Sequence, residues 1–274
     1  MTDLLSYGKQ IRCGMYALHS KFDTAANFIS EDSFAFVVDS RTGAGPLNIV
    51  LGGKLPGTVN SLEVRKDSLC LDNEEIPLRE SLVYDSTIPP VRLDICLIQR
   101  NLQIFERLLV TCSPPKSLAF LLDEKRKPEF TSAFDIALVE RCEDGVRQLL
   151  DGEYMAGGAI LKGLGYGFTP AGDDFISGFL IAMHVCQEST TTDLHPVIGT
   201  LYRSARGGNA FVNTFLACAA RGHVSRALKN LIFALCSAEA GEIEASTLLV
   251  LSHGATSGAD QAVGFLIGMK RFIS

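Results

Sequence analysis

The chain has 274 residues and a net charge of −6, with 47% hydrophobic and 20% charged residues. This length suits one large domain or two modest ones, burying roughly three quarters of the unfolded surface. The acidic balance, without a dense basic stripe, argues against a nucleic-acid-binding protein. No apolar run approaches the ~20 residues of a membrane span, and the first residues lack the build of a signal peptide. We therefore expect a cytoplasmic protein that binds neither nucleic acid nor membrane.

The cysteines and histidines do not indicate disulfides or a structural zinc site. None of the eight cysteines forms a C-x-x-C pair, and most stand among apolar residues, as small core residues do. The five histidines are scattered, with no pair at metal-ligand spacing. The cysteine and histidine patterns therefore do not identify a cofactor.

Short segments rich in apolar and aromatic residues recur through the first third of the chain. We expect strands near residues 14–22, 33–38, 47–51, 62–64 and 69–71. The tetrapeptide Arg65-Lys66-Asp67-Ser68 separates the last two, which is typical of a hairpin. This spacing predicts an N-terminal antiparallel β-sheet or partial barrel, in a strand-rich domain at residues 1–90.

The pattern changes after Pro89-Pro90, where apolar residues begin to recur at helical spacing. We expect helices near residues 93–109, 116–122, 133–150, 197–204, 210–221, 225–236, 243–252 and 257–272. The third of these should be interrupted near Asp144-Gly145. The fold class is therefore α+β, with a mainly α-helical domain at residues 91–274 that carries a glycine-rich loop.

The glycine-rich loop precedes a further apolar helix that runs to Met183. Gly163, Gly165 and Gly167 stand at alternate positions, where a backbone with positive φ can lie close to a ligand. Thr169 and Pro170 suit the cap and first position of a helix. This pattern is neither a dinucleotide fingerprint nor a P-loop, because the glycine spacing of both motifs is absent.

Two carboxylates follow in the opening turn of that helix, at Asp173 and Asp174, directly after Gly172. Free N–H groups of the loop and the positive helix end would attract an anion such as phosphate or carboxylate. The adjacent carboxylates are candidate catalytic residues and candidate ligands for Mg²⁺, which could bridge to that anion. The structural alternative is that the aspartates only complement the helix dipole.

The final helix repeats part of this pattern. Asp174 stands four residues before Gly178, and Asp260 four residues before Gly264, each glycine being followed by Phe-Leu-Ile. Residues four apart share a helix face, and glycine on that face allows another backbone to approach. We therefore expect the two helices to pack through these glycines, with the two aspartates approaching one pocket. Shared core geometry alone is the alternative.

The residues before the final helix and one further segment are candidates for substrate binding. Thr256 parallels Thr169, and Ser257 with Asp260 forms an [ST]-x-x-[DE] cap, a simpler explanation for Asp260 alone. Arg206 precedes a glycine pair and Asn209, which would cap the next helix. The arginine could hold a carboxylate or phosphate through two parallel hydrogen bonds, although a solvated surface arginine is the alternative.

These motifs carry a resemblance to a known family. Residues 163–175 (GLGYGFTPAGDDF) and 254–260 (GATSGAD) resemble a bacterial family, formerly of unknown function, that includes a subunit of oxamate carbamoyltransferase. That enzyme acts in anaerobic allantoin degradation, a branch of purine catabolism. The resemblance covers most of the chain, with two departures: Phe168 stands where leucine is usual, and 208–210 lacks an expected threonine.

The resemblance implies a subunit of a hetero-oligomeric complex. Such a complex would exchange a carbamoyl group between oxalurate and phosphate to give oxamate and carbamoyl phosphate. We expect the glycine loop and helix ends to bind the anionic substrate, and the isolated chain to be inert, because the sequence offers no nucleophile–base pair. Two alternatives stay open: a stand-alone Mg²⁺-dependent phosphoryl-transfer or hydrolytic enzyme, and a non-catalytic assembly subunit.

Overall fold

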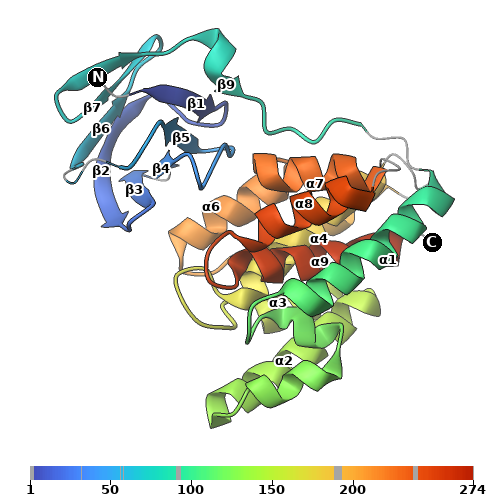
Figure 1. Ribbon diagram of the computed structural model, residues 1–274. Helices are drawn as coiled ribbons and strands as arrows, with labels where there is room; N and C mark the ends of the chain where they lie inside the picture. The colour runs from blue at the N-terminus through green and yellow to red at the C-terminus, as the bar shows by residue number, and fades with distance from the viewer. Residues whose placement is uncertain are drawn as a thin grey trace. The chain divides into compact units, whose positions relative to one another are not determined.

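The computed structural model describes residues 3–31, 33–55, 57, 59–90, 94–187, 193–236 and 240–273. The chain forms two compact units, one of Met1–Thr87 with His223–Ala227 and one of Ile88–Gly222 with Leu228–Ser274. Strands build the first unit and helices the second (Figure 1). The predicted α+β class is therefore confirmed. The predicted domains at residues 1–90 and 91–274 stay a prediction, because a compact unit is not by itself an independently folding domain.

A curled, half-barrel sheet forms the first unit (Figure 1). In the described part of the chain it has nine strands in the order β8-β7-β6-β2-β3-β4-β5-β1-β9. The strands are β1 (Leu4–Gly8), β2 (Gly14–Lys21), β3 (Ala25–Ser30), β4 (Ser33–Asp39), β5 (Asn48–Leu51), β6 (Ser61–Val64), β7 (Ser68–Leu71), β8 (Glu74–Pro77) and β9 (Val83–Tyr84). The β4–β5 and β1–β9 pairings are parallel and the others antiparallel, as a predominantly antiparallel partial barrel requires.

Alternating burial explains why the sequence predicts some of these strands and not others. In β6 and β7 every second residue is buried, and the N–H of Arg65 donates to the Ser68 carbonyl at 2.8 Å to close the predicted hairpin. The β1 strand was not predicted, because its partners β5 and β9 lie far along the chain and leave no local signal. The β9 strand was missed for the same reason, because it pairs with β1. The β3 and β8 strands were also missed, although they pair with strands adjacent in sequence.

Nine α-helices follow in the described residues, together with short 3-10 segments. The helices are α1 (Ile95–Cys112), α2 (Ala133–Leu150), α3 (Tyr154–Leu161), α4 (Ala171–Gln187), α5 (His195–Ala205), α6 (Ala210–Ala219), α7 (Arg226–Cys236), α8 (Ala240–Leu251) and α9 (Ser257–Phe272). Residue 93, where the first of them was expected to begin, lies outside the described residues. Within the described residues, none of these helices combines the length and hydropathy needed to cross a membrane.

The helices differ from the predictions in three respects. The α2 helix runs without a break through Gly145. Glycine stands at this position because its missing side chain makes room for another helix. A Cβ there would lie 2.7 Å from Cγ of Leu161 in α3. The α3 helix itself was not predicted. The short helix expected at 116–122 is present as a 3-10 helix, η2 (Leu118–Leu121), that follows a bend at Pro114–Ser117.

Helices α4 and α9 form the centre of the second unit and lie side by side (Figure 1). A Cβ on Gly178 would overlap the Gln261 carbonyl oxygen, and one on Gly264 would overlap the Phe175 carbonyl oxygen. Gly268 lies further along, against Ala182. Because these contacts advance together along both helices, α4 and α9 run parallel and begin at the same end. The predicted packing through Gly178 and Gly264 is confirmed.

We predict that Gly178→Ala lowers the free energy of unfolding by about 1–3 kcal/mol, because the added methyl group meets backbone atoms that cannot move aside. Chemical denaturation of the purified chain measures the change. Gly241→Ala in α8 is the matched control, since nothing lies within 4 Å of its added Cβ. It should change stability by less than about 1 kcal/mol. Equal effects of the two variants would contradict the packing described.

Candidate functional site

The first turns of α4 and α9 lie together because the two helices are parallel. The Thr169 hydroxyl, just before α4, lies 2.8 Å from the Ser257 hydroxyl, which opens α9. The N–H groups of Asp173 and Asp174 donate to the Pro170 carbonyl at 3.0 and 3.1 Å, which closes the first turn of α4. The predicted loop, helix start and final helix therefore meet at one place.

The glycine-rich loop, residues 162–170, requires glycine at its three alternate positions. The φ angles of Gly163, Gly165 and Gly167 are +67°, +130° and +84°, which other residues rarely adopt. A Cβ on Gly165 would lie 2.5 Å from the Ala171 nitrogen, so the loop folds closely onto the start of α4. Gly172 is required for another reason, because its absent side chain allows α4 to pass over the Leu161 carbonyl at the end of α3.

Two aromatic residues of the loop contact the first turns of other helices. The Tyr166 hydroxyl donates to Oδ1 of Asp135 in α2 at 2.8 Å, and its ring lies 4.7 Å from that of Phe134. The Phe168 ring lies 4.3 Å from that of Phe211 in α6. The loop is therefore surrounded by the N-terminal turns of α2, α4, α6 and α9. Each helix start contributes a partial positive charge, and positive charge attracts anions.

The segment between α5 and α6 contributes less directly to this place. The Asn209 side chain accepts from the N–H groups of Phe211 and Val212 at 3.0 and 3.3 Å, so it caps α6. Arg206 is exposed at the end of α5, where its guanidinium lies 5.9 Å from the Tyr202 ring centre. The predicted roles of Arg206 and Asn209 in substrate binding stay predictions.

The adjacent aspartates make different contacts, because successive side chains on a helix point roughly 100° apart. Asp173 is buried, and both its carboxylate oxygens lie 3.1 Å from the Gly163 nitrogen, which donates to them. Burial raises the pKa of Asp173 to about 6. Asp173 therefore holds the start of the glycine loop against α4.

Asp174 instead faces α9. Burial, and then the nearby carboxylate of Asp260, raise the pKa of Asp174 well above its ordinary value, while hydrogen bonds from Ser257 and Thr169 oppose the shift. Its Oδ2 atom is buried without a hydrogen-bond partner. The predicted approach of Asp174 and Asp260 is therefore present. In the described residues, no group of three or more His, Cys, Asp or Glu side chains is arranged to hold a metal ion.

Asp260 is 0% exposed, and the N–H of Leu118 donates to its Oδ1 at 2.6 Å. Its Oδ2, like that of Asp174, is buried and unpartnered. Burial raises the pKa of Asp260 to about 7, although the bonds from Leu118 and then Thr256 oppose the shift. The predicted cap of Ser257 and Asp260 is therefore wrong: Thr256 is the N-cap residue of α9 without a side-chain cap hydrogen bond, and the Asp260 carboxylate reaches η2.

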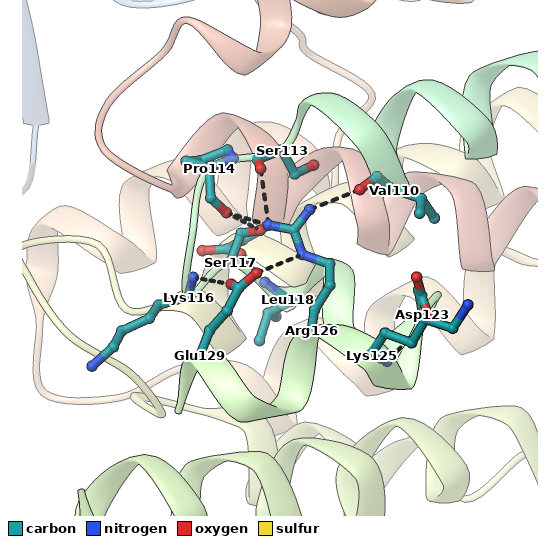
Figure 2. A network of polar contacts seen from close by, with 11 residues as sticks. Val110, Ser113, Pro114, Lys116, Ser117, Leu118, Asp123, Lys125, Arg126 and Glu129 are labelled. Carbon is teal, nitrogen blue, oxygen red and sulfur yellow. Dashed lines mark hydrogen bonds and ion pairs between the residues drawn. The ribbon is translucent and has the colours of Figure 1, made fainter. Parts of the chain in front are cut away.

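A cluster around Arg126 holds the segment that presents the Leu118 nitrogen (Figure 2). The guanidinium donates to the carbonyls of Val110, Ser113 and Pro114 at 2.8 to 2.9 Å, and its Nε lies 3.5 Å from Oε1 of Glu129. These contacts join the end of α1 to the bend before η2. They fix the backbone that supplies a donor to Asp260.

Lys116 and Asp135 connect this segment to the glycine loop. Lys116 has a φ of +59°, and its N–H donates to Oε2 of Glu129 at 2.8 Å. Its ammonium lies 2.9 Å from Oδ2 of Asp135. Asp135 is fully buried, and its other oxygen, Oδ1, accepts from the Tyr166 hydroxyl. A backbone hydrogen bond from Ser132 and then the Lys116 ammonium hold the pKa of Asp135 well below its ordinary value.

Sequence reasoning missed these supporting residues. The capping box formed by Ser132 and Asp135 has a recognisable S-x-x-D spacing before an apolar run and could have been found. Arg126 had no such signal, because its partners are carbonyl oxygens that any sequence supplies.

Comparison with known proteins places this site within a matched region. Residues 161–269, from the end of α3 to the last turn of α9, match the family model described as oxamate carbamoyltransferase subunit AllH. This match supports the resemblance recognised from the sequence: over these residues the chain is similar to a family of oxamate carbamoyltransferase subunits. No curated protein and no solved structure matches the chain.

We predict that Asp260→Asn weakens the pH dependence of stability between pH 4 and 7. The ordinary carboxyl pKa is about 3.9, so in this window the folded chain holds a proton on Asp260 that the unfolded chain releases. Stability from this group is complete below about pH 4 and is lost as pH rises through about 7, by up to about 4 kcal/mol. Asparagine cannot ionise, yet it keeps an oxygen for the Leu118 nitrogen.

Denaturation curves at several pH values would measure this change against the wild-type chain, in which Asp173 and Asp174 contribute in the same direction. Asp151→Asn, at the exposed end of α2, is the matched control and should reproduce the wild-type profile. An Asp260→Asn profile parallel to wild type would contradict the burial described.

Proposed function

We propose that this chain is a subunit of a carbamoyltransferase complex that converts oxalurate and phosphate to oxamate and carbamoyl phosphate. The observation that carries the proposal is the glycine-rich loop, with three positive-φ glycines among the first turns of α2, α4, α6 and α9. This loop lies inside the region matched to the family. Several helix N-termini close together support binding of an anionic substrate. Oxalurate, phosphate, oxamate and carbamoyl phosphate are all anions.

The proposed reaction needs positioning and charge stabilisation more than a protein nucleophile. A phosphate oxygen attacks the ureido carbon of oxalurate, and the bond from that carbon to the oxamate nitrogen breaks. The nitrogen gains a proton to complete the oxamate amide. Helix N-termini and loop N–H groups beside the carbonyl oxygen would stabilise the negative charge that develops there.

The residues proposed to bind substrate are Gly163, Gly165, Gly167, Thr169, Thr256 and Ser257, with Arg206 at the margin. Asp173 and Asp174 are the proposed catalytic carboxyl groups. Asp174 is the stronger candidate, because its Oδ2 has no partner while both oxygens of Asp173 serve Gly163. Asp260, Gly172 and Asn209 would contribute by shaping the site.

The two alternatives make different demands. A stand-alone Mg²⁺-dependent enzyme would use Asp173 and Asp174 as metal ligands, and the divergence of these side chains weighs against it. A non-catalytic assembly subunit would tolerate changes at Asp174. No observation favours either alternative over the transferase subunit.

We predict that Asp174→Asn lowers the carbamoyl-transfer rate of the reconstituted complex at least about a hundredfold. The melting temperature of the chain should stay within a few degrees of wild type, because asparagine has nearly the same shape as aspartate and burial already disfavours the charged form of Asp174. Steady-state assays of phosphate-dependent oxalurate cleavage measure the rate. Asp151→Asn should retain full activity, and a fully active Asp174→Asn complex would refute the catalytic role.

We also predict that the isolated chain is inert towards oxalurate and carbamoyl phosphate, and that activity appears when partner subunits are added. The reason is that the site holds an anion but has no nucleophile–base pair. Kinetics on the purified chain with and without co-purifying partners test this. Robust carbamoyl transfer by the chain alone would overturn the subunit proposal.

A further inference from the structure

Two buried carboxylate oxygens at the start of α4 and α9 have no hydrogen-bond partner. Four buried side-chain polar atoms in the described residues lack a partner, and two of these are Oδ2 of Asp174 and Oδ2 of Asp260. The two aspartates occupy equivalent positions, each four residues before the glycine that brings the parallel helices together. The unpartnered atoms therefore coincide with the repeated motif.

The rest of each carboxylate is well supplied with donors. The Leu118 nitrogen donates to Oδ1 of Asp260 at 2.6 Å, and the hydroxyls of Thr169 and Ser257 serve Asp174. Each carboxylate is thus held by hydrogen bonds, and one oxygen of each, Oδ2, has no donor. A buried acceptor without a donor is costly, and a ligand that brings a hydrogen-bond donor would remove this cost.

The surroundings restrict what that partner can be. A divalent cation would lie at the positive ends of two helices, and no third His, Cys, Asp or Glu among the described residues completes a ligand set. A fully ionised oxyanion has no hydrogen to donate to these oxygens. A neutral N–H donor meets neither objection, since it satisfies an acceptor without bringing charge to the helix ends.

We infer that the unpartnered oxygens of Asp174 and Asp260 accept hydrogen bonds from the NH₂ group of a carbamoyl substrate. The inference rests on the proposed function and names how that site recognises its substrate class. The loop and helix N–H groups receive the anionic end, and the aspartates receive the amide end. Asp174 is partly exposed as a residue, although its Oδ2 is buried, and Asp260 is fully buried.

Carbamoyl phosphate and acetyl phosphate test this recognition directly. They have nearly the same shape and charge, but acetyl phosphate carries a methyl group in place of the NH₂ group. A site with buried acceptors discriminates strongly against an analogue that lacks the donor. We expect the full wild-type chain to bind carbamoyl phosphate at least about tenfold more tightly than acetyl phosphate, by calorimetry or phosphorus NMR.

Asp260→Asn and Asp174→Asn should reduce this preference to about twofold or less, since each replaces an acceptor oxygen by an NH₂ group. Asp151→Asn should keep the wild-type preference. The wild-type comparison stands by itself if a variant fails to fold. Equal binding of both compounds, binding of neither, or a preference that appears only with Mg²⁺ would each overturn the inference.

The proposed function is judged separately, by turnover of the complex. If the complex turns over oxalurate but the chain binds carbamoyl phosphate and acetyl phosphate equally, only the recognition by Asp174 and Asp260 is refuted. If the chain prefers carbamoyl phosphate but the complex does not turn over oxalurate, the proposed reaction is refuted and the amide-recognition site still stands.

Discussion

The helical unit depends on the close parallel contact between α4 and α9. Gly178 and Gly264 bring each backbone against the carbonyl oxygens of the other helix, at a distance that no side chain permits. The register of these contacts also places the starts of the two helices side by side. The contact therefore brings two positive helix ends to one place, which separate helices would disperse.

The same contact buries Asp174 and Asp260, and burial of carboxylates is costly unless donors surround them. The rest of the unit supplies those donors. Arg126 fixes the bend that presents the Leu118 nitrogen, and the hydroxyls of Thr169 and Ser257 join the two helix starts. The Oδ2 atoms of Asp174 and Asp260 receive no hydrogen bond from these elements, and a ligand can use them.

The sequence predicted the features that depend on local pattern or repetition. Alternating glycines predicted the loop, and the repeated Asp-x-x-x-Gly predicted the α4–α9 contact, because both depend on spacing within a few residues. The divergence of Asp173 from Asp174 was not predicted, since adjacent acidic residues look equivalent in a sequence. The Arg126 cluster and the first strand depend on partners far along the chain, which no local pattern records.

The central claim is that the joined starts of α4 and α9, with the glycine-rich loop, form one ligand site. A crystal structure of the chain with bound carbamoyl phosphate tests it most directly. The account predicts density for the ligand beside residues 163–169, with its phosphate at the loop and helix N–H groups and its nitrogen within hydrogen-bond distance of Asp174 and Asp260. Density elsewhere on the molecule, or a ligand reversed so that its phosphate faces the two aspartates, would contradict it.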